Sequence, residues 1–76
     1  PKTVLGFDLG PSAVKCVLTQ RGRVIGTGSG ALSVSVPKPG WSEQNPQDWI
    51  AATITAYNAA LKAADISSSE IAGVAL

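Results

Sequence analysis

The sequence has 76 residues, with six basic and five acidic side chains, one cysteine and no histidine. These counts exclude an internal disulfide framework and a Cys/His zinc site, and a net charge of +1 from scattered basic residues argues against nucleic-acid or membrane-surface partners. No apolar run approaches the roughly 18 residues of a membrane span. Because a core this small rarely supplies more than about 3–5 kcal/mol, we expect the chain to be part of a larger protein.

The first two segments of the chain have the composition of strands. Thr3–Leu9 is an almost continuous apolar run, which is typical of a strand covered on both faces. Gly10 to Ser12 form a turn by composition. In Ala13–Gln20, the side chains of Val14, Cys16 and Leu18 fall on one face, which predicts a second strand.

A third strand is predicted over residues 23–32, after a tight reversal in which Gly22 can take a positive φ. The three glycines of this segment predict a bulge or an edge position. Together the three strands predict an antiparallel meander. Residues 33–45 contain prolines that exclude a central strand or a helix, so we expect an irregular connection there.

A long helix is predicted over Pro46–Ala64. Asn45 is a strong N-cap, Pro46 suits the first helical position, and the carboxylate of Asp48 meets the positive end of the helix dipole. One apolar stripe recurs at spacings of three and four residues and consists of Ile50, Ile54, Tyr57, Leu61 and Ala64.

Residues 65–70 are predicted to form a short connection, in which one of three serines can cap a helical turn. Residues 71–76 are apolar and predict a short buried strand. A helical crossover makes the last strand parallel to the first, with a right-handed connection. The predicted fold is therefore an α/β unit of order β-β-β-α-β with a mixed sheet. The apolar ending suggests that the chain stops within an element, so we expect an incomplete domain.

An aspartate within the first strand is the first candidate for chemistry. Burial of the Asp8 carboxylate would cost several kcal/mol unless it is paired or coordinates a metal. One interpretation is a carboxylate that binds Mg²⁺, directly or through water, because Mg²⁺ prefers oxygen ligands and keeps several waters. An equally good interpretation from residue type alone is a carboxylate that accepts hydrogen bonds from the backbone of the following turn.

The turn that follows is the second candidate. A glycine turn between two strands can expose backbone N–H groups to an anion, Ser12 adds a hydroxyl donor, and Lys15 adds a positive charge suited to phosphate. The residues alone favour an ordinary hairpin with a solvated lysine. The spacing is not that of a Walker motif, which continues from the glycine loop into a helix.

Other residues are interpreted as structural. The stretch over residues 39–46 leads into the helix, with Trp41 as a packing anchor and a lesser prospect that Glu43 or Gln44 lies near a substrate. Cys16 is a small core residue. Trp49 and Tyr57 are packing aromatics of the helix.

The combination of segments resembles a known family. GFDLGPSAVKCVL is similar to the first phosphate-binding hairpin of the actin, heat-shock and sugar-kinase superfamily, which has a ribonuclease H-like, actin-like ATPase fold. PGWSEQNPQDWI and IAGVAL resemble the helix entrance and the following strand of the xylulokinase-like (FGGY) carbohydrate kinases. The resemblance covers essentially the whole chain. It implies that residues 1–76 are the N-terminal part of the first of two large domains, with the second domain absent.

The resemblance carries roles onto matched positions. Asp8 matches a strand-end aspartate near Mg²⁺, Gly10 and Ser12 match the turn that faces the ATP phosphates, and Lys15 matches a basic residue that reaches them. Pro11 departs from the family pattern, which has threonine, so one N–H and one hydroxyl are missing here. The resemblance places the catalytic base and most of the sugar site downstream, so the fragment alone is expected to be inactive.

The implied reaction is transfer of the γ-phosphoryl group from ATP, with Mg²⁺, to a hydroxyl of a ketopentose, for which D-xylulose is favoured. The partners implied are a small sugar and the remainder of the kinase chain, and the full-length protein could form a homodimer. The expected location is the cytoplasm. Three alternatives stay open: another acceptor such as gluconate, ribulose or glycerol, a non-enzymatic actin-like ATPase module, and a small free-standing binding domain.

Overall fold

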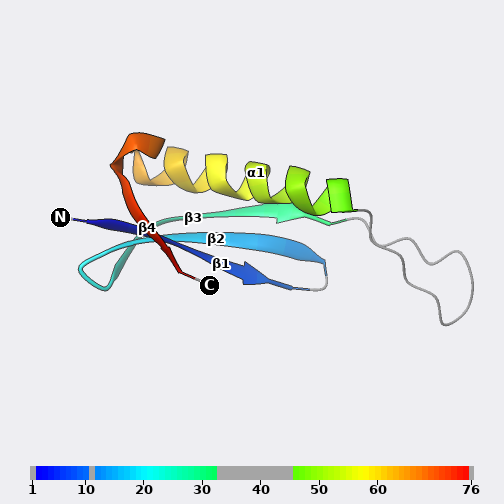
Figure 1. Ribbon diagram of the computed structural model, residues 1–76, viewed down its shortest axis with the longest axis horizontal. Helices are drawn as coiled ribbons and strands as arrows, with labels where there is room; N and C mark the ends of the chain where they lie inside the picture. Colours follow the sequence, from blue (N-terminus) through cyan, green and yellow to red (C-terminus); the bar gives the residue numbers. More distant parts are fainter. Residues whose placement is uncertain (1, 11, 33–45, 76) are drawn as a thin grey trace, which may run out of the picture.

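The computed structural model describes residues 2–10, 12–32 and 46–75 as one sheet with a helix along one face (Figure 1). The sheet has the strand order β3-β2-β1-β4. In chain order, the elements are β1 (Thr3–Leu9), β2 (Ala13–Gln20), β3 (Arg23–Ala31), the helix α1 (Pro46–Ala64), a 3₁₀ turn (Ser68–Glu70) and β4 (Ile71–Ala75). Pro11, residues 33–45 and the predictions made for them, including the Asn45 cap, lie outside the described residues.

The strand pairing confirms the predicted topology. β1 and β3 both pair antiparallel with β2, whereas β4 pairs parallel with β1. The bounds of β1, β2 and α1 agree with those predicted, and β3 ends one residue earlier, at Ala31. The mixed β-β-β-α-β sheet is therefore confirmed, with β3 at one edge as its glycines predicted.

A two-residue turn joins β2 to β3. Arg21 and Gly22 have φ values of 52° and 75°, and the strands close on the pair formed by Gln20 and Arg23. Positive φ at both central residues is the pattern of a type I′ turn, whose twist matches that of a hairpin. Gly22 thus takes the positive φ predicted for it.

A bulge in β3 follows this turn. Thr19 pairs with Val24 but Leu18 pairs with Gly26, so Ile25 is an extra residue on β3. Because side chains alternate along a strand, one extra residue exchanges the faces of everything beyond it. The exchange puts Gly26, Gly28 and Gly30 on the face of β2 that carries Leu18, Cys16 and Val14, their pairing partners.

The three glycines let α1 lie directly on the backbone of β3. A Cβ atom built on Gly26 would lie 2.8 Å from the carbonyl oxygen of Ala60, and one on Gly28 or Gly30 would overlap the carbonyl oxygen of Ala56 or Ala52. These alanines are almost completely buried. Four residues of an α-helix rise about 6 Å and two residues of a strand about 6.6 Å, so the two repeats stay in step along the contact.

The buried face of α1 is therefore not the predicted apolar stripe. Ile50 and Ile54 are 60% and 54% exposed, because the glycines admit the alanine face and turn the larger side chains aside. Ile54 and Tyr57 instead line an apolar groove of about 330 Å³ beside β1 and β4. The other lining residues of this groove are Leu5, Phe7, Thr53 and Val74.

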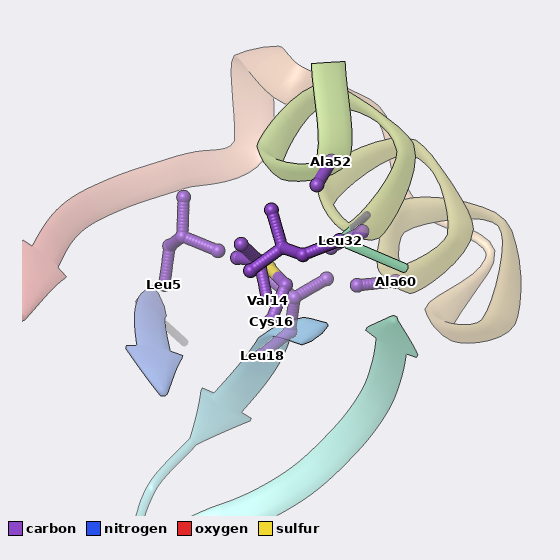
Figure 2. Packing of buried hydrophobic residues seen from close by; sticks show 8 residues of the cluster. Leu5, Val14, Cys16, Leu18, Leu32, Ala52 and Ala60 are labelled. Carbon is purple, nitrogen blue, oxygen red and sulfur yellow. The ribbon is translucent and has the colours of Figure 1, made fainter. Parts of the chain in front are cut away.

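The core lies between α1 and the β2–β3 half of the sheet. Its larger buried side chains are Leu5, Val14, Cys16, Leu18 and Leu32, which gather on the side of the sheet that carries α1 (Figure 2). Thr3 is also buried, and its hydroxyl oxygen Oγ1 accepts a hydrogen bond of 2.8 Å from Nε2 of Gln20.

The expected burial of β1 on both faces and of β4 is wrong for the described chain. Asp8 and Leu9 at the end of β1 are exposed, and so are Ala72, Val74 and Ala75 of β4. The physical reason is that α1 covers one face of β2 and β3, whereas β4 lies at the far edge of the sheet.

Ser67, one of the three serines predicted to cap a turn between α1 and β4, lies at the N-cap position of the 3₁₀ turn. The backbone N–H of Ser67 donates to Oε2 of Glu70 over 2.8 Å, and the N–H of Glu70 donates to the carbonyl oxygen of Ser67 over 3.0 Å. Within the described residues, no helix has the length and apolarity needed to cross a membrane.

The contact between β3 and α1 can be tested by Gly28→Ala in the full-length protein. The added methyl group would overlap the backbone of α1, so we expect a loss of about 2–3 kcal/mol in the free energy of unfolding. Urea unfolding monitored by tryptophan fluorescence would measure this loss.

Gly73→Ala is the matched control, because a Cβ at Gly73 would meet no atom within 4 Å. We expect its effect to stay within about 0.5 kcal/mol. Equal unfolding midpoints for the two variants would contradict the close packing of α1 on β3.

Candidate functional site

The turn between β1 and β2 is fixed by two backbone hydrogen bonds. The N–H of Gly10 donates to the carbonyl oxygen of Ala13 over 3.0 Å, and the N–H of Leu32 donates to the carbonyl oxygen of Ser12 over 2.8 Å. The first bond occupies the N–H that the sequence left open for a phosphate, so Gly10 could serve a phosphate through its small size rather than as a donor. The second bond ties the turn to the end of β3.

The candidate charged residues lie opposite one another beside this turn. Asp8 on β1 pairs with Lys15 on β2, and residues paired directly across antiparallel strands share a face. This face is the one turned away from α1, because the neighbouring pair of Phe7 and Cys16 points toward the core. The structure thus brings Asp8 and Lys15 together, with the exposed Ser12 in the turn between their strands.

The expected burial of Asp8 is wrong for the described chain. Its side chain is exposed, because it lies on the open face of β1 beyond the reach of α1. Exposure removes the argument that a buried carboxylate needs a metal or a backbone partner. It also turns the carboxylate toward solvent, an orientation that by itself counts against the kinase assignment.

The arrangement can nevertheless serve a magnesium nucleotide. Mg²⁺ is typically held by one or two carboxylates together with substrate phosphates and water, so the single carboxylate of Asp8 is enough to serve as the protein ligand. In the described part of the chain, no three His, Cys, Asp or Glu side chains gather to hold a metal by themselves. Lys15 supplies a positive charge on the same face, and the Ser12 hydroxyl can donate to a phosphate oxygen.

Comparison with known proteins identifies the family. Residues 3–76 match the N-terminal domain of the FGGY family of carbohydrate kinases. The chain belongs to the FGGY family. Its similarity to FGGY relatives includes 39% identity to a xylulose kinase of Bacillus subtilis, over 96% of this chain and 15% of that protein. It includes 46% identity to a xylulose kinase of Klebsiella pneumoniae, over 72% of this chain and 12% of that protein.

A solved FGGY relative supports the fold assignment. The crystal structure of a xyloylose kinase from Brucella ovis superimposes with a TM-score of 0.75 and 47% sequence identity, covering 80% of this chain and 13% of that chain. The predicted actin-like ATPase fold class is thereby confirmed. The chain spans about one seventh of the length of the relatives it matches.

Sequence reasoning missed one polar residue next to the candidate site. Ser29 on β3 pairs with Lys15, on the side of β2 opposite to Asp8. Without a bulge, the pairing that starts at the hairpin turn would have placed Gly28 opposite Lys15 instead of Ser29. A glycine-rich strand does signal a bulge, but it does not tell where the bulge lies, so Ser29 could not be assigned from the sequence.

The remaining residues of interest lie elsewhere. Cys16 is buried on the core face, and Trp49 and Tyr57 lie on α1, half-buried against the core. The interpretation of all three as packing residues is confirmed. Glu43 and Gln44, which were considered as residues near a substrate, lie outside the described residues.

Cys16 provides a chemical test of the core. Burial raises the pKa of the Cys16 thiol, so the reactive thiolate forms at higher pH in the folded protein than in the unfolded chain. We expect iodoacetamide at pH 8 to label Cys16 at least tenfold more slowly in the native full-length protein than in guanidinium chloride, as measured by mass spectrometry of its peptide.

The exposed Thr55→Cys variant supplies the control thiol, which should react at similar rates in the native protein and in guanidinium chloride. Rapid labelling of native Cys16 would show that the core is open.

The raised pKa of Cys16 in the folded state also makes its contribution to stability depend on pH. This contribution is complete below the unfolded pKa of about 8.5 and is lost as the pH rises above it.

Proposed function

We propose that the full-length protein is an ATP-dependent sugar kinase that phosphorylates a hydroxyl of D-xylulose. The observation that carries this proposal is the match to the FGGY family, together with xylulose kinases among the relatives at 39–46% identity. Membership of the family supports ATP as the phosphoryl donor. The lone buried cysteine suits a reducing compartment, so the proposal places the enzyme in the cytoplasm.

In this proposal the described residues hold the phosphates rather than carry out the proton transfer. The carboxylate of Asp8 would hold Mg²⁺, directly or through water, and the ion when bound would supply neutralisation of the charge on the transferred phosphoryl group. The ammonium of Lys15 and the hydroxyl of Ser12 contact the terminal phosphates. Gly10 keeps the turn small enough for the phosphates to approach.

The reaction forms a bond between the sugar oxygen and the γ-phosphorus and breaks the bond to the β-phosphate oxygen, which leaves with ADP. The hydroxyl proton passes to a general base that lies downstream of residue 76. Positioning and charge neutralisation dominate transfers of this kind, so the contribution of residues 8–15 is to fix the phosphate tail.

Glycerol is the second candidate acceptor. A glycerol kinase from Thermococcus gammatolerans is 33% identical over 93% of this chain, and glycerol kinase 5 of Mus musculus is 32% identical over 96%. Both values are lower than those for the xylulose kinases, which favours xylulose.

The acceptor is tested with the purified full-length protein. We expect ADP release to depend on D-xylulose, with kcat/KM at least 100-fold higher than for glycerol, D-ribulose or gluconate in a coupled assay. Higher kcat/KM for glycerol would replace the acceptor but keep the kinase. ATP turnover unaffected by any sugar would support a non-enzymatic ATPase module instead.

The role of Asp8 is tested by Asp8→Asn in the same protein. Loss of the carboxylate removes a magnesium ligand, so we expect kcat to fall on the order of 100-fold while the unfolding midpoint stays unchanged.

Asp65→Asn is the matched control, since Asp65 is exposed in the segment between α1 and β4 and asparagine tolerates its φ of 56°. It should retain full activity. If Asp8→Asn turned over xylulose as fast as this control, Asp8 would have no part in the mechanism.

A further inference from the structure

A row of three polar side chains crosses the open face of the sheet beside the β1–β2 turn. Lys15 on the central strand pairs with Asp8 on one side and with Ser29 on the other, and all three are exposed. We propose that Ser29 is a positioning residue that holds the Lys15 ammonium for the ATP phosphates. The proposal rests on the proposed kinase function.

The register places the three side chains within reach of one another. Directly opposed residues of antiparallel strands have Cβ atoms about 4.5–5.5 Å apart, so Lys15 lies between two polar neighbours. Its ammonium has three N–H donors. One donor can go to the hydroxyl oxygen of Ser29, which leaves two for phosphate oxygens and leaves the carboxylate of Asp8 for the metal.

The neighbouring rows on this face lack such a combination. The next row away from the turn contains Gly6, Val17 and Thr27, and the pair nearer the turn consists of Ala13 and Ala31. These rows carry no charge. Four of their five residues are Gly, Ala or Thr, so only short side chains surround most of the polar row, and a triphosphate could come close to it.

The backbone at Ser29 is held in place on both sides. Its neighbours Gly28 and Gly30 contact the backbone of α1, and the N–H of Leu32 is bonded to the carbonyl oxygen of Ser12 in the turn. A short side chain on a fixed strand loses little conformational entropy when it bonds. Ser29 is therefore a stable anchor for the flexible lysine.

The test is Ser29→Ala in the full-length protein. Loss of one hydrogen bond to Lys15 should raise KM for ATP about fivefold, with KM for the sugar unchanged. Ser29→Thr keeps the hydroxyl and should restore the wild-type KM. Thr27→Ala, on the same strand and face but opposite Val17, is the matched control and should match the wild type.

A double mutant separates a positioning role from a structural one. Lys15→Met should raise KM for ATP more than Ser29→Ala does, and adding Ser29→Ala to Lys15→Met should change nothing further. Additive effects, an unchanged KM in Ser29→Ala, or an unchanged KM in Lys15→Met would each overturn the role of Ser29. Failure of the kinase function itself would appear differently, as wild-type protein that releases no ADP in response to any sugar.

Discussion

The fold depends on one backbone-to-backbone contact, in which an alanine face of α1 lies on three alternate glycines of β3. This contact leaves no room between the two elements for a side chain larger than that of alanine. It therefore fixes the height, the direction and the rotation of α1 over the sheet. Larger core side chains such as Leu5 and Leu18 then fill the space beside the contact instead of beneath the helix.

The position of α1 divides the molecule into a covered face and an open face. The covered face contributes to stability, and its thiol and aromatic side chains are packing groups. The open face carries the charged pair of Asp8 and Lys15 where β1 and β2 meet in a turn. Because the covered and open faces are separate, strands with a mostly apolar sequence can still carry exposed charged side chains at one end.

Local patterns made most of the fold predictable. The apolar runs, the Arg21-Gly22 turn and the Pro46 helix start gave the elements and their order, because each depends on neighbouring residues. The buried face of α1 was not predictable by hydrophobicity, since Ile50 and Ile54 outrank alanine on any such scale. Only the partner strand decides, and its glycines favour the smaller side chains. The exposure of Asp8 and the place of Ser29 likewise depend on pairing between distant segments.

The extra residue at Ile25 has a consequence for how this protein can vary in length. Removing Ile25 itself would erase the bulge and leave Leu18 paired with Gly26, so the glycines would still face α1. Adding one residue between Arg23 and Gly26 would instead exchange the faces of the rest of β3 unless a second bulge absorbed it. Thr27 and Ser29 would then lie against the helix, and glycines would face outward across from Lys15. This stretch of β3 should therefore tolerate the loss of one residue better than the gain of one.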